Sequence, residues 1–270
     1  MLGKLLKYDF RSLYRPFVLT WSAVLALALL TRITYFYPDP VPYTSDMFFA
    51  RLALGAYLIC LLATVVVAVV LVIQRFYKGV WGNEGYLLHP LPVRSWQILL
   101  SKLISAAALF FLSILIAIGS FFLLLPLGDP RFEDLTRSFQ ALFQALSGWP
   151  LLTLLLSMLS DIIRSCLLLY LSMAAGHLFA RRHVVMSVVA FLVLSFLSNL
   201  LLDLLTGLLV PELNLSLALG IISSDVGPAT VALPENMVLS QVMAGLISLA
   251  VSAVYFFSAA WILEKKLNLE

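Results

Sequence analysis

Six long runs of apolar residues alternate with shorter polar stretches along the chain, near 17–37, 51–74, 97–125, 149–180, 183–203 and 237–263. About 20 helical residues, at about 1.5 Å each, cross a hydrocarbon core about 30 Å thick. The short alternating segments typical of a membrane β-barrel are missing. Hydrophobic residues make up 62% of the chain and charged residues 11%, with a mean hydropathy of +1.04. The pattern predicts an all-α membrane protein with six transmembrane helices in one domain, 1–270.

The first 16 residues have a different pattern, in which apolar and basic side chains fall on separate faces of a helix. The apolar face would carry Leu2, Leu6, Phe10 and Leu13, and the basic face Lys4, Lys7, Arg11 and Arg15. This predicts an amphipathic helix on the membrane surface, with Pro16 at the turn into the first span. An ordinary basic flank that orients the first span is the alternative.

Two regions do not fit a simple span. Pro150 indicates a helix start, yet a helix from there to Ala180 would be about 48 Å long, more than one bilayer needs. We therefore expect the outer boundary near Asp161, with 149–160 in or along the outer interface. Between the fifth and sixth spans, the apolar pieces 204–210 and 213–222 are too short to cross and predict re-entrant or interfacial helices.

The positive charges give the predicted orientation, because Lys and Arg near span ends are retained on the cytoplasmic side. Most cations fall on one side of the six spans, which places both termini in the cytoplasm; they are Lys4, Lys7, Arg11, Arg15, Arg75, Lys78, Arg94, Lys102, Arg181, Arg182, Lys265 and Lys266. The formal net charge of +3 then reflects membrane orientation and gives no indication of nucleic-acid binding.

Asp161 and Arg164 are the most distinctive charged residues inside an apolar run, three positions apart on one helical face. A charged pair within a span is a functional candidate. Counting up from Ala180 places Arg164 about 24 Å along the helix, near the outer boundary, so we favour an interfacial structural pair over a transport role. We interpret His177 and His183 as residues at the membrane interface and not as metal ligands. We expect Cys60 and Cys166 to pack as small apolar side chains.

Small residues at Gly245, Ser248, Ser252 and Ala259 form a seam along the last span, and Gly176 permits a close approach at the end of the fourth. Such seams let helices pack tightly. Packing within one subunit and contact between two subunits both remain open. The chain has no phosphate-cradling, esterase-type or metalloprotease-type motif. It is therefore not expected to be an enzyme or to hold a cofactor.

The segment from Gln74 to Leu103 is the longest charged, glycine-rich and proline-rich stretch on the predicted cytoplasmic side. Gly79, Gly82 and Gly85 permit sharp turns, and Ser95 can cap the helix that re-enters the membrane. A simple connector rarely needs so many residues. The segment predicts a contact with a protein outside the membrane, and a tight loop without a partner is the alternative.

Several short motifs resemble the permease subunits of type-2 ATP-binding-cassette (ABC) exporters, in their short bacterial form with a separately encoded ATPase. The similarity lies in M-L-G-K-L-L-K-Y-D-F at 1–10, R-F-Y-K at 75–78, N-E-G-Y-L at 83–87, L-P-V at 91–93, L-L-S-K-L at 99–103 and, more loosely, G-H-L-F at 176–179. The resemblance implies a coupling helix within 75–96 that contacts the ATPase. The implied contact residues are Lys78, Asn83, Glu84, Gly85 and Tyr86.

The same resemblance implies two permease subunits, identical or different, with two ATPase subunits that hold ATP and Mg²⁺, in a bacterial inner or plasma membrane. The expected function is export of a hydrophobic or amphipathic substrate: a lipid, a peptide or a drug. One alternative is an ABC-type module that senses or resists a peptide antibiotic without net export. A further alternative is an ion-coupled secondary transporter that uses Asp161.

Overall fold

The computed structural model of the chain describes residues 2–36, 46–80, 95–124, 148–178, 183–209 and 235–267. All regular structure within these ranges is helical, and each of the six helices is long and apolar enough to cross a membrane. The prediction of an all-α, multi-pass membrane protein is therefore confirmed. The chain divides into two compact units, Met1–Thr136 and Arg137–Glu270, each with three of these helices.

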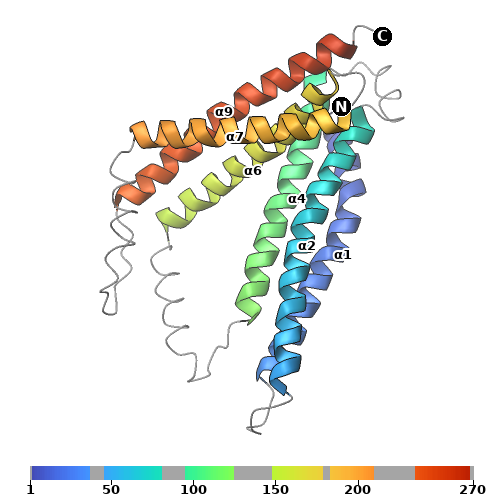
Figure 1. Ribbon diagram of the computed structural model, residues 1–270, viewed down its shortest axis with the longest axis vertical. Coiled ribbons are helices and arrows are strands. Elements are labelled where there is room, and N and C mark those ends of the chain that lie inside the picture. Colours follow the sequence, from blue (N-terminus) through green and yellow to red (C-terminus); the bar gives the residue numbers. More distant parts are fainter. Residues whose placement is uncertain are drawn as a thin grey trace. The chain divides into compact units, whose positions relative to one another are not determined.

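Unit 1 is built around its first helix. α1 (Leu2–Phe36) packs against both α2 (Asp46–Val80) and α4 (Ser95–Leu124), whereas α2 and α4 touch each other little. Figure 1 shows the three helices running alongside one another. One buried cluster joins all three helices through Leu13, Phe17, Ala68 and Leu109. A second cluster further along contains Val24, Ala28 and Tyr57. α1 is thus the central helix of unit 1.

Unit 2 has the same plan, with its first helix in the middle. α6 (Trp149–Gly176) packs against α7 (His183–Leu209) and most extensively against α9 (Glu235–Leu267), while α7 and α9 have fewer contacts (Figure 1). Pro150 lies in the first turn of α6, as its sequence position predicts, because a missing N–H costs nothing there. Gly148 precedes the helix with a φ of 80°, a conformation that glycine adopts readily.

The small residues pack within unit 2. A methyl group added to Gly176 would overlap Ser187 Oγ and come within 2.6 Å of the Ser187 backbone N and Cα, so α6 and α7 touch at their backbones. The predicted close approach at Gly176 is therefore confirmed. Ser248, Ser252 and Ala259 on α9 are all buried, and Gly245 faces Ser157 of α6 at ordinary contact distance. The seam on α9 thus serves packing inside this unit.

The structure corrects the prediction of a separate helix over residues 1–16. α1 runs without a break from Leu2 to Phe36, and Pro16 lies inside it. A proline in a helix removes one hydrogen bond and crowds the preceding turn. Here Leu13 and Phe17, on either side of Pro16, belong to the same buried cluster. Packing on both sides of the proline keeps the helix continuous.

Two further stretches bear on the predicted spans. Residues 149–160 and 161–176 form one helix within the predicted fourth span, 149–180, and this helix ends at Gly176 with His177 as its C-cap. Residues 204–209 are the last turns of α7, so they form no separate re-entrant helix. Asp203 is exposed on the α7 surface, and the helix continues past it to Leu209. Residues 81–94 of the predicted coupling segment 75–96 and the predicted piece 213–222 lie outside the described residues.

Candidate functional site

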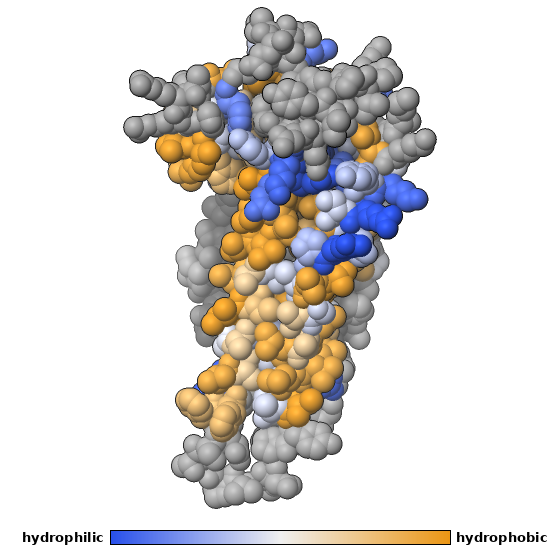
Figure 2. Space-filling model, turned by 90° about the vertical axis from the view of Figure 1, so that its right-hand side faces the viewer, coloured by the Kyte–Doolittle hydropathy of each residue, from blue (hydrophilic) through white to orange (hydrophobic). Residues whose placement is uncertain are grey.

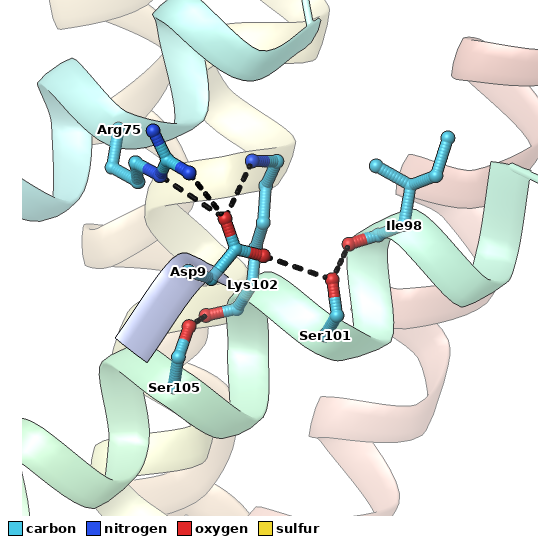
Figure 3. A network of polar contacts seen from close by, with 6 residues as sticks. All are labelled: Asp9, Arg75, Ile98, Ser101, Lys102 and Ser105. Carbon is cyan, nitrogen blue, oxygen red and sulfur yellow. Dashed lines mark hydrogen bonds and ion pairs between the residues drawn. The ribbon is translucent and has the colours of Figure 1, made fainter. Parts of the chain in front are cut away.

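A buried carboxylate connects the three helices of unit 1 at one end. Asp9 Oδ1 of α1 accepts hydrogen bonds from Arg75 Nη2 and Nε of α2, at 2.8 and 3.0 Å. Lys102 Nζ of α4 lies 3.5 Å from the same oxygen, and Ser101 Oγ donates to Asp9 Oδ2 at 3.1 Å. Figure 3 shows the four side chains converging from the three helices. We call this group the Asp9 cluster.

The Asp9 cluster is almost closed to solvent. The side chains of Asp9, Arg75 and Lys102 are 6%, 11% and 4% exposed. The guanidinium of Arg75 also lies 5.5 Å from the Tyr8 ring centroid, within the range of a cation–π contact. Removing one member of such a buried pair typically destabilises a protein by about 3–5 kcal/mol, because the remaining charge stays buried. The cluster therefore acts as a firm electrostatic lock between α1, α2 and α4.

The Asp9 cluster lies beside both ends of the predicted coupling segment, 75–96. Arg75 is in the last turns of α2, which ends at Val80, and Lys102 is in the first turns of α4, which begins at Ser95. Both helices that lead into this segment are thus held to α1. Lys78 is exposed on α2, whereas the other implied contact residues, Asn83, Glu84, Gly85 and Tyr86, lie outside the described residues.

Further cations surround the lock on the surface. Lys7, Arg11 and Arg15 are exposed along α1 at intervals of one helical turn. Figure 2 shows a mainly apolar face of the molecule, with hydrophilic side chains gathered toward one end. Three of the predicted cytoplasmic stretches, at the start of α1, the end of α2 and the start of α4, therefore share one end of unit 1.

No family model, curated protein or solved structure matches this chain. Function is therefore inferred from the chain's own residues and their geometry.

A second charged group connects the three helices of unit 2. Arg164 Nε lies 3.6 Å from Asp161 Oδ1, both on α6. Ser248 Oγ of α9 donates to the same carboxylate oxygen at 3.0 Å. Arg164 Nη1 donates to Ser198 Oγ of α7 at 3.1 Å and lies 3.5 Å from Asn199 Oδ1. We call these five residues the Asp161 cluster.

The Asp161 cluster lies halfway along its helices. At about 1.5 Å per residue, Asp161 is about 18 Å from the start of α6 and about 22 Å from its end. Ser198 and Ser248 are also near the middle of α7 and α9. The sequence predicts a position near the outer membrane boundary, from a count of residues back from Ala180. In the structure, Asp161 and Arg164 lie near the midpoint of α6.

The two charges of the Asp161 cluster are unequally covered. The Arg164 side chain is 16% exposed and the Asp161 side chain 58% exposed. Arg164 Nε is buried without a hydrogen-bond partner, so the 3.6 Å ion pair is its main polar contact. An ionised side chain in the middle of a membrane costs about 2.5–3.5 kcal/mol on insertion scales and usually faces protein or water. The carboxylate, not the guanidinium, is the accessible charge.

The histidines and cysteines do not form a comparable centre. Within the described ranges, no three His, Cys, Asp or Glu side chains gather as metal ligands would. His177 Nδ1 lies 3.0 Å from the Met173 carbonyl oxygen at the end of α6. Cys166 is buried in α6, and Cys60 packs beside the second apolar cluster of unit 1, both as free thiols. These side chains fit ordinary roles in helix packing.

Sequence reasoning missed the Asp9 cluster, which carries the densest charge in the described chain. Asp9 falls between Lys7 and Arg11, and it was read only as part of a resembling motif. One signal could have identified it. Asp9, Leu13 and Phe17 recur at helical spacing, and Leu13 and Phe17 are core residues. A carboxylate on the buried face of a basic helix requires a cation from elsewhere in the fold.

Proposed function

We propose that the chain is the membrane-spanning permease subunit of an ABC exporter, in which ATP is hydrolysed by a separate partner chain. The observation that carries this proposal is the Asp9 cluster. It binds the two helices that flank the predicted coupling segment to the central helix of unit 1. A simple loop between two spans would not require such a lock.

The lock suits the transmission of movement. A force on residues 81–94 would act on the end of α2 and the start of α4 together. Because Asp9 joins both helices to α1, the three would move as one body. Buried ion pairs resist sliding, since any displacement leaves charges without partners. Alternating access through such rigid-body movement would carry a hydrophobic or amphipathic substrate across a bacterial inner membrane.

The charge distribution supports the orientation that this function needs. Exposed Lys7, Arg11, Arg15 and Lys78 gather at the same end as the Asp9 cluster, and cations of this kind favour the cytoplasmic side. The coupling segment would then face the compartment that contains ATP. Lys78, Asn83, Glu84, Gly85 and Tyr86 are the proposed contacts with the ATPase, with ATP and Mg²⁺ bound there. A second permease subunit would complete the transporter.

The test begins with purification of the tagged chain from its own membranes and measurement of copurified ATPase activity. Glu84→Lys and Gly85→Pro are expected to leave membrane insertion unchanged and to abolish stimulation of ATP hydrolysis and transport in vesicles. Glu235→Lys, a matched charge reversal at the first residue of α9 and on the opposite predicted side, is the control. Wild-type coupling in both loop variants would refute the proposal. ATPase stimulation without transport would instead support the sensing or resistance module.

One observation favours a second candidate, ion-coupled secondary transport. Asp161 lies at the midpoint of α6, has a 58% exposed side chain and faces a basic partner. Carboxylates in such positions serve as proton or ion sites in transporters. This candidate requires no ATPase. Transport in vesicles that is driven by an ion gradient without ATP, and lost in Asp161→Asn, would favour it.

A further inference from the structure

The carboxylate of Asp161 has one occupied and one open oxygen. Oδ1 receives the Ser248 hydroxyl at 3.0 Å and lies 3.6 Å from Arg164 Nε. Within the described chain, Oδ2 has no hydrogen bond or ion pair, and the side chain is 58% exposed. A carboxylate can accept about four hydrogen bonds. Half of its accepting capacity is therefore available at the surface of unit 2.

The exposed part of the Asp161–Arg164 pair is its acidic side chain, which favours a positively charged ligand. Arg164 is only 16% exposed, and its described contacts are to Ser198, Asn199 and Asp161. A molecule that approaches the middle of α6 therefore meets a carboxylate, with the guanidinium behind it. Exposed Ser165, one helical turn from Asp161, adds a hydroxyl to the same face. The accessible groups are mainly acceptors, which suits a cation that donates hydrogen bonds.

The surroundings favour an organic cation over a metal ion. Met158 and Leu154 share the helical face of Asp161, one and two turns toward the start of α6, and both are half-buried. Ca²⁺ and Mg²⁺ take about six or more oxygen ligands, and within the described ranges no three His, Cys, Asp or Glu side chains gather around Asp161. An alkylammonium needs only a few acceptors and an apolar surface for its chain. The site meets both requirements.

We infer that Asp161 binds the ammonium headgroup of a cationic amphiphile, so that the cargo class is a lipid, peptide or drug with a positively charged amine. This inference rests on the proposed export function and narrows its substrate. A carboxylate halfway along an apolar helix, with one oxygen open, is expected to face a polar partner and not lipid chains. A transported headgroup would supply that partner.

The test measures binding of radiolabelled dodecylammonium to the purified chain in non-ionic micelles, with empty micelles as the blank. We expect one saturable site per chain and at least a tenfold rise in Kd for Asp161→Asn. Asp203→Asn, the same substitution at an exposed carboxylate of α7, is the matched control and should change Kd less than twofold. Dodecyl sulfate should show no saturable site.

Ser248→Ala distinguishes two causes of weaker binding in Asp161→Asn. It removes the hydrogen bond between α6 and α9 but keeps the carboxylate charge. This variant removes one of the two partners of Oδ1, so it should bind dodecylammonium at least as tightly as wild type. Unchanged binding in Asp161→Asn would overturn the inference. Displacement of dodecylammonium by millimolar sodium or potassium would also overturn it and identify an inorganic-cation site. Because no ATPase is present, failure here leaves the coupling test of the proposed function unaffected.

Discussion

The two units contain similar charged groups, which differ in their position along the helices and in how much of the carboxylate side chain is exposed. In unit 1, the carboxylate of Asp9 lies at the end of the helices and is surrounded by two cations and a serine, with 6% of its side chain exposed. In unit 2, Asp161 lies at the helix midpoint and is 58% exposed. Each carboxylate belongs to a cluster that connects three helices, but only the carboxylate of Asp9 has both oxygens engaged.

The number of carboxylate oxygens that already have partners distinguishes a structural role from a binding role. A carboxylate whose oxygens are all engaged and covered can do little except hold its partners in place. A carboxylate with an open oxygen at mid-membrane retains the capacity to take a ligand. The Asp9 cluster thus suits the proposed mechanical role beside the proposed coupling segment. The Asp161 cluster suits the proposed contact with cargo.

The largest expected difference is between Asp9→Asn and Asp161→Asn. Asp9→Asn should lower the free energy of unfolding of unit 1 by about 3–5 kcal/mol, because the buried Arg75 and Lys102 lose the carboxylate charge that they share. Asp161→Asn should cost unit 2 less, about 1–3 kcal/mol, because the Asp161 side chain is 58% exposed, although the buried Arg164 Nε loses its main polar contact. Each unit contains one free cysteine, Cys60 or Cys166, so thiol labelling during denaturant titration reports on each unit separately.

Mass spectrometry of the labelled peptides distinguishes Cys60 from Cys166 without further substitutions. Asp203→Asn, at an exposed position on α7, should leave both labelling curves unchanged. Equal losses from Asp9→Asn and Asp161→Asn would remove the distinction between a lock and an open site. A loss at Cys166 from Asp9→Asn would show that the two units unfold together.

The helices themselves were largely predictable from the sequence. Long apolar runs predict six helices because a bilayer demands them, and six were found. The errors arose where local signals competed with packing. Pro16 and Asp203 both suggested helix ends, yet α1 continues because Leu13 and Phe17 share one core cluster. α7 likewise continues past Asp203 to Leu209.

The charged groups were only partly predictable. Asp161 and Arg164 are three residues apart, so helical spacing alone indicates that they can meet. Asp9, Arg75 and Lys102 are far apart in the chain, and no periodic pattern connects them. Ser248 was recognised as a small residue in a seam, but its hydroxyl also serves Asp161. Contacts of this kind depend on which helix faces lie together, which composition does not specify.

A smaller effect is expected where Gly176, at the end of α6, packs closely against Ser187 of α7. Gly176→Ala should destabilise this unit by about 1–3 kcal/mol, because the added methyl group would overlap Ser187 of α7. Gly245→Ala is the matched control, since its methyl group would lie 3.7 Å from Ser157 Cα. Cys166 labelling provides the measurement. If Cys166 in both glycine variants is labelled at the same denaturant concentration as in wild type, the close contact between α6 and α7 does not contribute to the stability of unit 2.

The smallest effect is expected halfway along the helices of unit 1, where a neutral hydrogen bond joins α1 to α4. Trp21 Nε1 of α1 donates to Ser113 Oγ of α4 at 2.9 Å. Ser113→Ala should cost about 0.6 kcal/mol, a typical value for one hydrogen bond between membrane helices. Ser22→Ala is the control, because Ser22 bonds only to the Leu19 carbonyl of its own helix. A loss at Cys60 as large as that from Asp9→Asn would mean that unit 1 is held mainly at its middle, and the end cluster could not then be its lock.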